Sequence, residues 1–159
     1  MQQEQRLSLP EPDAESAAHS ARVADFLREK IAAAGGMISF AEYMHHVLYA
    51  PGLGYYSAGA AKFGPSGDFV TAPEVSPVFG GVLARQCASV LARVDSPSIL
   101  EFGAGSGRLA VDVLHKLADL EVLPDRYLII EVSADLRERQ EALLRQEIPE
   151  LIEKVAWLD

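Results

Sequence analysis

The sequence predicts an α/β protein in which a parallel sheet with helices on both faces follows an N-terminal region of helices and loops. Strand and helix patterns alternate from residue 98 onward, which is typical of a parallel sheet covered by helices. A glycine-rich turn joins the first of these strands to its helix. The 159 residues are 49% hydrophobic and 23% charged, as expected for a globular domain that buries a core.

Composition and charge argue against several classes of protein. The formal net charge is -9, with acidic residues spread along the chain, so a nucleic acid partner would be repelled on average. No apolar run approaches the roughly 18 residues that span a bilayer, and residues 1–20 lack the features of an export or organelle signal. Because Cys87 is the only cysteine, we expect it to be a buried free thiol. Together with the lack of an apolar run and of a signal, this predicts no membrane contact and a cytoplasmic, reducing location.

Two helices are expected after a disordered leader at residues 1–14. Apolar residues recur at spacings of three and four from residue 15 to 34, and the Gly35–Gly36 pair then ends the pattern. Ser39 and Glu42 form a capping box at the start of the second helix. Its apolar stripe consists of Phe40, Tyr43, Met44, Val47 and Leu48.

A loop rich in glycine and proline is expected over residues 51–77, with short extended pieces around Tyr55–Tyr56 and Phe69–Val70. A loop of this length in a compact domain is usually functional or disordered, and its aromatic residues favour the first interpretation. A third helix is expected from residue 76 to about 94. The side chains expected on its inward face are Val78, Phe79, Val82, Leu83, Val90 and Leu91.

The remaining chain is expected to form three strands and two helices. The strands are predicted at 98–102, 127–131 and 154–158, and the helices at 107–120 and 133–147. Residues 15–97 are therefore expected to form the N-terminal region and 98–159 the first part of the sheet domain. Since a doubly wound sheet usually has about five strands or more, we expect the C-terminal part of this domain to follow Asp159.

The turn after the first of these strands predicts a cofactor site. Gly103, Gly105 and Gly107 follow a strand and open a helix, so a ligand can approach the backbone amides and the helix N-terminus. A dinucleotide-binding turn would have its third glycine where Arg108 stands. Glu101 precedes the turn, and a carboxylate there repels a pyrophosphate but attracts ammonium and sulfonium groups. The pattern therefore favours S-adenosylmethionine (SAM) over NAD.

Glu131 ends the second strand of the sheet. Doubly wound folds place an acid there to accept hydrogen bonds from ribose hydroxyls, although an exposed strand-end carboxylate is the alternative. Methyl transfer from a sulfonium requires mainly proximity and orientation, so the sequence assigns no catalytic residue. His45 and His46 are adjacent on a helix and therefore point about 100° apart, and we expect no metal site.

Three segments carry a family resemblance. They are Tyr55–Tyr56, the block from Gly67 to Gly80 with the sequence GDFVTAPEVSPVFG, and the run from Glu101 to Gly107. Together they resemble the MidA-like SAM-dependent methyltransferases, a family that includes the mitochondrial arginine methyltransferase that assists assembly of respiratory complex I. The resemblance extends from about residue 38 to the end of the chain, and the block is more specific than the glycine turn.

The resemblance implies a class I methyltransferase (Rossmann-like) fold, with SAM at the strand ends and the block from Gly67 to Ser76 closing over it. It also implies a protein substrate, with an arginine side chain as methyl acceptor. Within the block, the alternative for Glu74 and Ser76 is that they only cap the third helix. The residues expected to contact SAM or shape its site are Gly67, Asp68, Thr71, Glu74, Ser76, Glu101, Gly103, Ala104, Gly105, Gly107 and Glu131.

Two other functions stay open beside a methyltransferase. An NAD-dependent oxidoreductase is disfavoured by Glu101 and Arg108. A non-catalytic assembly factor that keeps SAM as a bound ligand is not disfavoured by any residue, because binding the cofactor does not require turnover.

Overall fold

The computed structural model describes residues 11–59 and 67–158. The chain divides into two compact units, Met1–Tyr55 and Tyr56–Asp159, so the block and the third helix fall in the same unit as the sheet. Residues 1–10 of the expected leader lie outside the described residues. No helix within the described ranges combines the length and apolar character needed to cross a membrane.

The smaller unit consists of two helices, α1 (Ala14–Ala33) and α2 (Phe40–Tyr49). Both were predicted, and Gly35–Gly36 follows α1 with positive φ angles of 82° and 98°, a backbone conformation that favours glycine. The expected capping box is confirmed. The backbone N–H of Ser39 donates to Glu42 Oε2 at 2.8 Å, and the N–H of Glu42 donates to Ser39 Oγ at 3.2 Å.

The larger unit contains a three-stranded parallel sheet in chain order. Its strands are β1 (Ser98–Phe102), β2 (Arg126–Ile130) and β3 (Val155–Leu158), joined through α5 (Arg108–Asp119) and α6 (Ala134–Glu147). The predicted ends of all five elements are confirmed to within one residue. A short 3₁₀ turn precedes β3. Connections between parallel strands are right-handed in nearly all proteins, and two such connections that run in the same direction along a sheet place their helices, here α5 and α6, on the same face.

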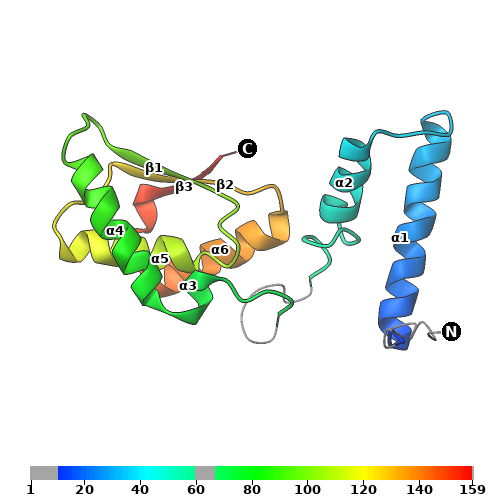
Figure 1. Ribbon diagram of the computed structural model, residues 1–159, viewed down its shortest axis with the longest axis horizontal. Coiled ribbons are helices and arrows are strands. Elements are labelled where there is room, and N and C mark those ends of the chain that lie inside the picture. The colour runs from blue at the N-terminus through cyan, green and yellow to red at the C-terminus, as the bar shows by residue number, and fades with distance from the viewer. Residues whose placement is uncertain (1–10, 60–66, 159) are drawn as a thin grey trace, which may run out of the picture. The chain divides into compact units, whose positions relative to one another are not determined.

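The two faces of the sheet differ in burial. On one face, Tyr127, Ile129 and Val155 are buried against α5 and α6, whose core residues include Val111, Leu114, Leu117, Leu144 and Ile148. The other face carries Leu100, Phe102, Leu128, Ile130 and Leu158. Figure 1 shows α4, α5 and α6 on the same side of the strands. Among the described elements, therefore, helices cover one face of the sheet, whereas the sequence predicted helices on both.

The helix α4 (Pro77–Leu91) forms where a third helix was predicted, but it presents a different face to the core. Its buried residues are Gly80, Ala84 and Leu91. The expected inward residues other than Leu91 are exposed, namely Val78, Phe79, Val82, Leu83 and Val90. A Cβ atom on Gly80 would lie 2.5 Å from the Cβ of Asp112 on α5. The small residues of α4 therefore allow its backbone to pack closely on α5, and larger side chains point away.

Three further details of the region before the sheet differ from expectation or refine it. A short helix, α3 (Ala72–Val75), lies inside the expected loop. Tyr55–Tyr56 lies in turns, and only an isolated bridge forms at Phe69. Cys87 is half-buried against the core, and this burial raises the pKa of its thiol.

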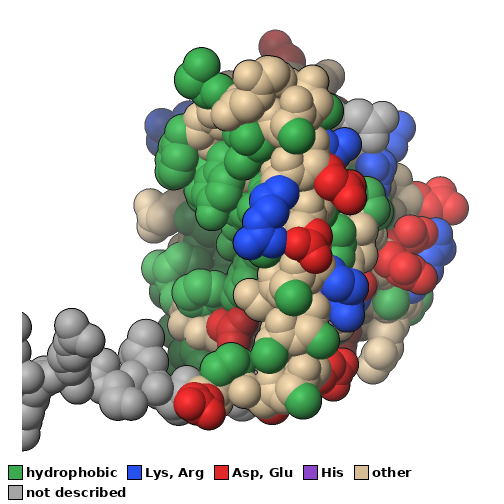
Figure 2. Space-filling model, turned by 90° about the vertical axis from the view of Figure 1, so that its right-hand side faces the viewer, with side chains coloured by type: hydrophobic (Ala, Val, Ile, Leu, Met, Phe, Trp, Pro, Cys, Tyr) green, Lys and Arg blue, Asp and Glu red, His purple; other side chains and the backbone are tan. Residues whose placement is uncertain are grey.

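Figure 2 shows hydrophobic side chains gathered along one side of the surface and charged side chains over much of the rest.

Candidate functional site

A cavity of about 380 Å³ lies where β1 ends and the glycine turn begins. Its walls come from α3, the start of α4, β1, the glycine turn and the first turn of α5. The carboxyl ends of parallel strands are the usual place for ligands in open α/β sheets. The lining residues are Thr71, Pro73, Glu74, Phe79, Glu101, Phe102, Gly103, Ala104, Gly105, Ser106 and Leu109.

The glycine turn has a backbone that only glycine adopts readily. Gly103, Gly105 and Gly107 have φ angles of 63°, 57° and 87°, all in the left-handed region. The N–H of Gly103 donates to the carbonyl of Ile130 on β2 at 2.8 Å, and the N–H of Gly107 donates to Ala104 O at 2.8 Å. The turn is therefore held against the sheet, and Gly107 leads directly into α5.

Glu101 places a carboxylate on the wall of the cavity. Its Oε2 accepts a hydrogen bond of 2.7 Å from the hydroxyl of Tyr127, a buried residue of β2. Burial raises the pKa of Glu101, and the bond from Tyr127 acts in the opposite direction. The pair thus holds an acidic side chain in an orientation that suits a positively charged ligand group.

Glu74 connects α3 to the glycine turn. Its carboxylate accepts a hydrogen bond from the hydroxyl of Ser106, and Ser106 Oγ also accepts from the N–H of Arg108 at 3.2 Å. Ser76, in contrast, caps α4 by accepting from the N–H of Val78 at 3.2 Å. The capping interpretation therefore describes Ser76, whereas Glu74 contacts the turn that lines the cavity.

Glu131 lies beside the glycine turn although it does not line the cavity. Its Oε1 accepts from the N–H of Ser133 at 3.0 Å, and its Oε2 accepts from Gln140 Nε2 at 3.0 Å. The same Gln140 nitrogen donates to the carbonyl of Gly105 at 3.0 Å. The carboxylate and the turn therefore share one buried donor, and each carboxylate oxygen keeps a lone pair for another partner.

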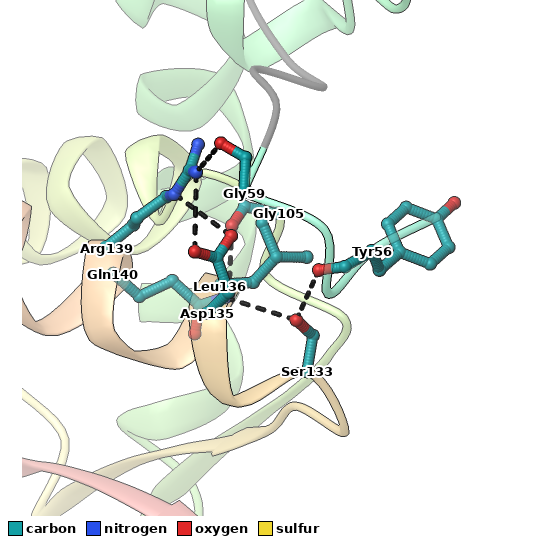
Figure 3. Close-up of polar contacts among 8 residues, drawn as sticks. All are labelled: Tyr56, Gly59, Gly105, Ser133, Asp135, Leu136, Arg139 and Gln140. Carbon is teal, nitrogen blue, oxygen red and sulfur yellow. Dashed lines mark hydrogen bonds and ion pairs between the residues drawn. The ribbon is translucent and has the colours of Figure 1, made fainter. Parts of the chain in front are cut away.

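The start of the long loop is attached to α6, as Figure 3 shows. The Ser133 hydroxyl donates to the carbonyl of Tyr56 at 2.6 Å, and Arg139 Nη2 donates to the carbonyl of Gly59 at 2.5 Å. Arg139 also pairs with Asp135 at 3.1 Å, one helical turn away. These bonds hold the segment 56–59 next to the start of α6, close to Glu131.

The structure brings six of the eleven expected site residues to the cavity and leaves five outside its lining. Those that line it are Thr71, Glu74, Glu101, Gly103, Ala104 and Gly105. Those that do not are Gly67, Asp68, Ser76, Gly107 and Glu131.

Five residues that line the cavity were not predicted from the sequence. They are Pro73, Phe79, Phe102, Ser106 and Leu109. The first four lie inside the two motifs, so their position beside chosen residues was the available signal. In the described part of the chain, no group of three His, Cys, Asp or Glu residues is placed to hold a metal ion.

Comparisons with known proteins agree with this geometry. Residues 82–159 match a family model described as "Putative S-adenosyl-L-methionine-dependent methyltransferase". A COG1565 superfamily member from Burkholderia thailandensis, solved with bound S-adenosyl-homocysteine, superposes with a TM-score of 0.82 and 49% identity, covering 96% of this chain and 40% of that one.

Two curated relatives are named mitochondrial protein arginine methyltransferases of the NDUFAF7 type. The one from Drosophila melanogaster is 42% identical over 112 residues, or 67% of this chain and 25% of the relative. The one from Mus musculus is 38% identical over 119 residues, or 70% of this chain and 27% of the relative. The chain thus spans about a quarter of the length of these relatives.

These relatives correct one expectation from the sequence. The prediction of a cytoplasmic location is wrong, because the matching animal proteins are named as mitochondrial. A single cysteine and the lack of a long apolar run do not distinguish one reducing compartment from another.

The parallel sheet and the structural match confirm a Rossmann-like class I fold. The match over residues 82–159 and these relatives support the resemblance to the MidA-like SAM-dependent methyltransferases.

Proposed function

We propose that the protein is a SAM-dependent methyltransferase that binds SAM at the end of β1 and transfers its methyl group to a protein side chain such as arginine. The observation that carries the proposal is the Glu101 carboxylate, which lines the cavity next to the glycine turn and is oriented by Tyr127. The similar protein bound to S-adenosyl-homocysteine and the relatives named arginine methyltransferases support it.

The residues of the cavity fit the chemical groups of SAM. Glu101 offers a negative charge for the ammonium and sulfonium groups. Glu131, beside Gly105, has lone pairs free for the ribose hydroxyls. The left-handed glycine turn presents backbone without side-chain bulk. The aromatic and aliphatic side chains of Phe79 and Leu109 supply an apolar wall.

When bound, SAM supplies an activated methyl group, so the chain needs to bind and orient rather than to attack covalently. Glu101 would hold the charged methionine part of the cofactor and Glu131 its ribose, and Glu74 would hold α3 against the turn through Ser106. The acceptor side chain has to approach the sulfonium in line with the bond that breaks. No described residue is assigned to that second substrate.

An isothermal titration with SAM and with NAD tests the cofactor. We expect heat of binding for SAM only, because a pyrophosphate beside Glu101 is repelled. Heat for NAD and none for SAM would overturn the proposal. A methyltransferase and a non-catalytic SAM-binding assembly factor are then distinguished by mass spectrometry of arginine methylation in candidate partner proteins, with and without the gene.

A glycine substitution tests the position of SAM. A Cβ on Gly103 meets no protein atom within 4 Å, so the side chain of Gly103→Val would enter the cavity. We expect SAM affinity to fall at least about tenfold, which corresponds to about 1.4 kcal/mol.

The matched control for this substitution is Gly35→Val. Gly35 also has a positive φ and open space around its Cβ position, and it does not line the cavity. Both variants carry similar backbone strain, and equal loss of SAM binding in the two would count against the proposed site.

A further inference from the structure

Gln140 on α6 is fully buried, with 0% of its surface exposed, and its amide joins three separate parts of the larger unit. Its Oε1 accepts from the indole N–H of Trp157 on β3 at 2.9 Å. Its Nε2 donates to the carbonyl of Gly105 and to Glu131 Oε2, both at 3.0 Å. Figure 3 shows Gln140 and Gly105 side by side.

The partners of Gln140 determine which way its amide faces. An indole N–H can only donate, whereas a backbone carbonyl and a carboxylate can only accept. The amide oxygen must therefore face Trp157, and both N–H bonds must face Gly105 and Glu131. A flipped amide would place like groups against one another at all three contacts. Trp157 thus fixes the orientation of Gln140, although it does not itself contact the glycine turn by a hydrogen bond.

This arrangement also constrains Glu131. Gln140 holds one carboxylate oxygen and the N–H of Ser133 holds the other, so rotation of the carboxylate breaks at least one bond. Both donors are uncharged, so neither cancels the negative charge as a lysine or arginine would. Each oxygen retains a lone pair, and two acceptors side by side match the two neighbouring hydroxyls of a ribose.

We propose that Gln140 is a positioning residue that fixes Glu131 relative to Gly105, so that the carboxylate accepts both ribose hydroxyls of the cofactor while the turn lies beneath it. The inference rests on the proposed function, because it assumes that Glu131 contacts the ribose. The inference adds Gln140 to the residues of the site, beside the glycine turn and Glu131.

Three substitutions separate this role from simple packing. Gln140→Leu has a similar size but loses every hydrogen bond. Gln140→Glu keeps the shape and places a second carboxylate oxygen against Gly105 O and Glu131. Trp157→Phe removes the donor that fixes the amide and leaves Gln140 in place. Gln146→Leu, at an exposed position of the same helix, is the matched control.

The experiment measures the affinity of the full-length protein for S-adenosyl-homocysteine and for its 2′-deoxyribose analogue. We expect the wild-type protein to prefer the ribose form about tenfold or more, as for a hydrogen bond to a carboxylate. In folded Gln140→Leu and Gln140→Glu this ratio should fall towards one, and in Trp157→Phe it should fall part of the way. Gln146→Leu should keep the wild-type ratio.

The other outcomes overturn one of the two proposals. If Gln140→Leu weakens the binding of both ligands equally, the ratio of their affinities is unchanged, and Gln140 only packs. A wild-type ratio near one also rejects the positioning role. If the wild-type protein binds neither ligand, the proposed function itself fails. Should Gln140→Leu and Gln140→Glu not fold, judged by circular dichroism, the ratio in Trp157→Phe decides, because Gln140 then still fills its site.

Discussion

Glu101 is a residue at which burial and hydrogen bonding act on one carboxylate in opposite directions. Burial raises its pKa, and the bond from Tyr127 lowers it. In the folded protein the pKa of Glu101 lies above its ordinary value. Between the unfolded and the folded pKa, the native state therefore keeps a proton on Glu101 that the unfolded chain has lost. The contribution of Glu101 to stability therefore decreases as the pH rises from the unfolded pKa through the folded one. Such a cost is consistent with a binding role.

The pH dependence of SAM binding follows from the same shift. If the ionised carboxylate attracts SAM, affinity should fall as the pH is lowered through the raised pKa of Glu101, a range in which an amino group stays protonated. Glu101→Gln should bind more weakly, by about tenfold, and lose this dependence. Tyr127→Phe removes the bond that lowers the pKa of Glu101, so its loss of affinity should begin at higher pH. Titration calorimetry across this range measures both effects, and identical profiles for wild type and Glu101→Gln would refute them.

Individual site residues were predictable where backbone geometry or charge demands a residue type. The positive φ angles of Gly103, Gly105 and Gly107 explain the glycines, and Glu101 was selected for its charge. Ser106 and Gln140 were missed because their roles depend on contacts with Glu74 and with Glu131, which lie 32 and 9 residues away. Neither backbone geometry nor charge requires a hydroxyl or an amide at these positions, so their roles become visible only when the fold brings their partners together.

At the level of elements, α4 shows where periodicity stops being sufficient. The apolar spacing correctly predicted a helix, yet the helix buries Gly80 and Ala84 and exposes most of the larger apolar side chains. Periodicity identifies the faces of a helix, but which face meets α5 depends on how closely two backbones can approach. The strands and helices of the sheet were easier to predict because strand and helix patterns alternate there.

The close contact between α4 and α5 is open to a direct test. A Cβ on Gly80 would lie 2.5 Å from Asp112 Cβ, so Gly80→Ala should lower the free energy of unfolding by about 1–3 kcal/mol through overpacking. Gly81→Ala is the matched control, since nothing lies within 4 Å of its Cβ position. The control should be neutral or more stable by about 0.5–1 kcal/mol because alanine favours helix. Urea unfolding followed by circular dichroism measures both values, and equal effects would contradict the close packing.

Over the whole of the larger unit, the sheet is apolar on both faces while the described helices cover one. Leu100 and Phe102 remain 46% and 71% exposed on the uncovered face, although strands of a parallel sheet are normally buried on both sides. Ile129, which faces α5 and α6, is fully buried. Side chains on the face that packs against α5 and α6 should therefore contribute more to the free energy of unfolding than those on the uncovered face.

Paired threonine substitutions test this asymmetry. Leu100→Thr should change the free energy of unfolding by less than about 1 kcal/mol, because its side chain is already partly solvated, whereas Ile129→Thr should cost about 2–4 kcal/mol by placing a hydroxyl in the core. Exposed apolar surface binds the dye ANS, so Leu100→Thr should lower ANS fluorescence and Ile129→Thr should raise it. If Leu100→Thr proves as destabilising as Ile129→Thr, the face of the sheet that carries Leu100 is covered in solution, and the predicted asymmetry between the two faces is wrong.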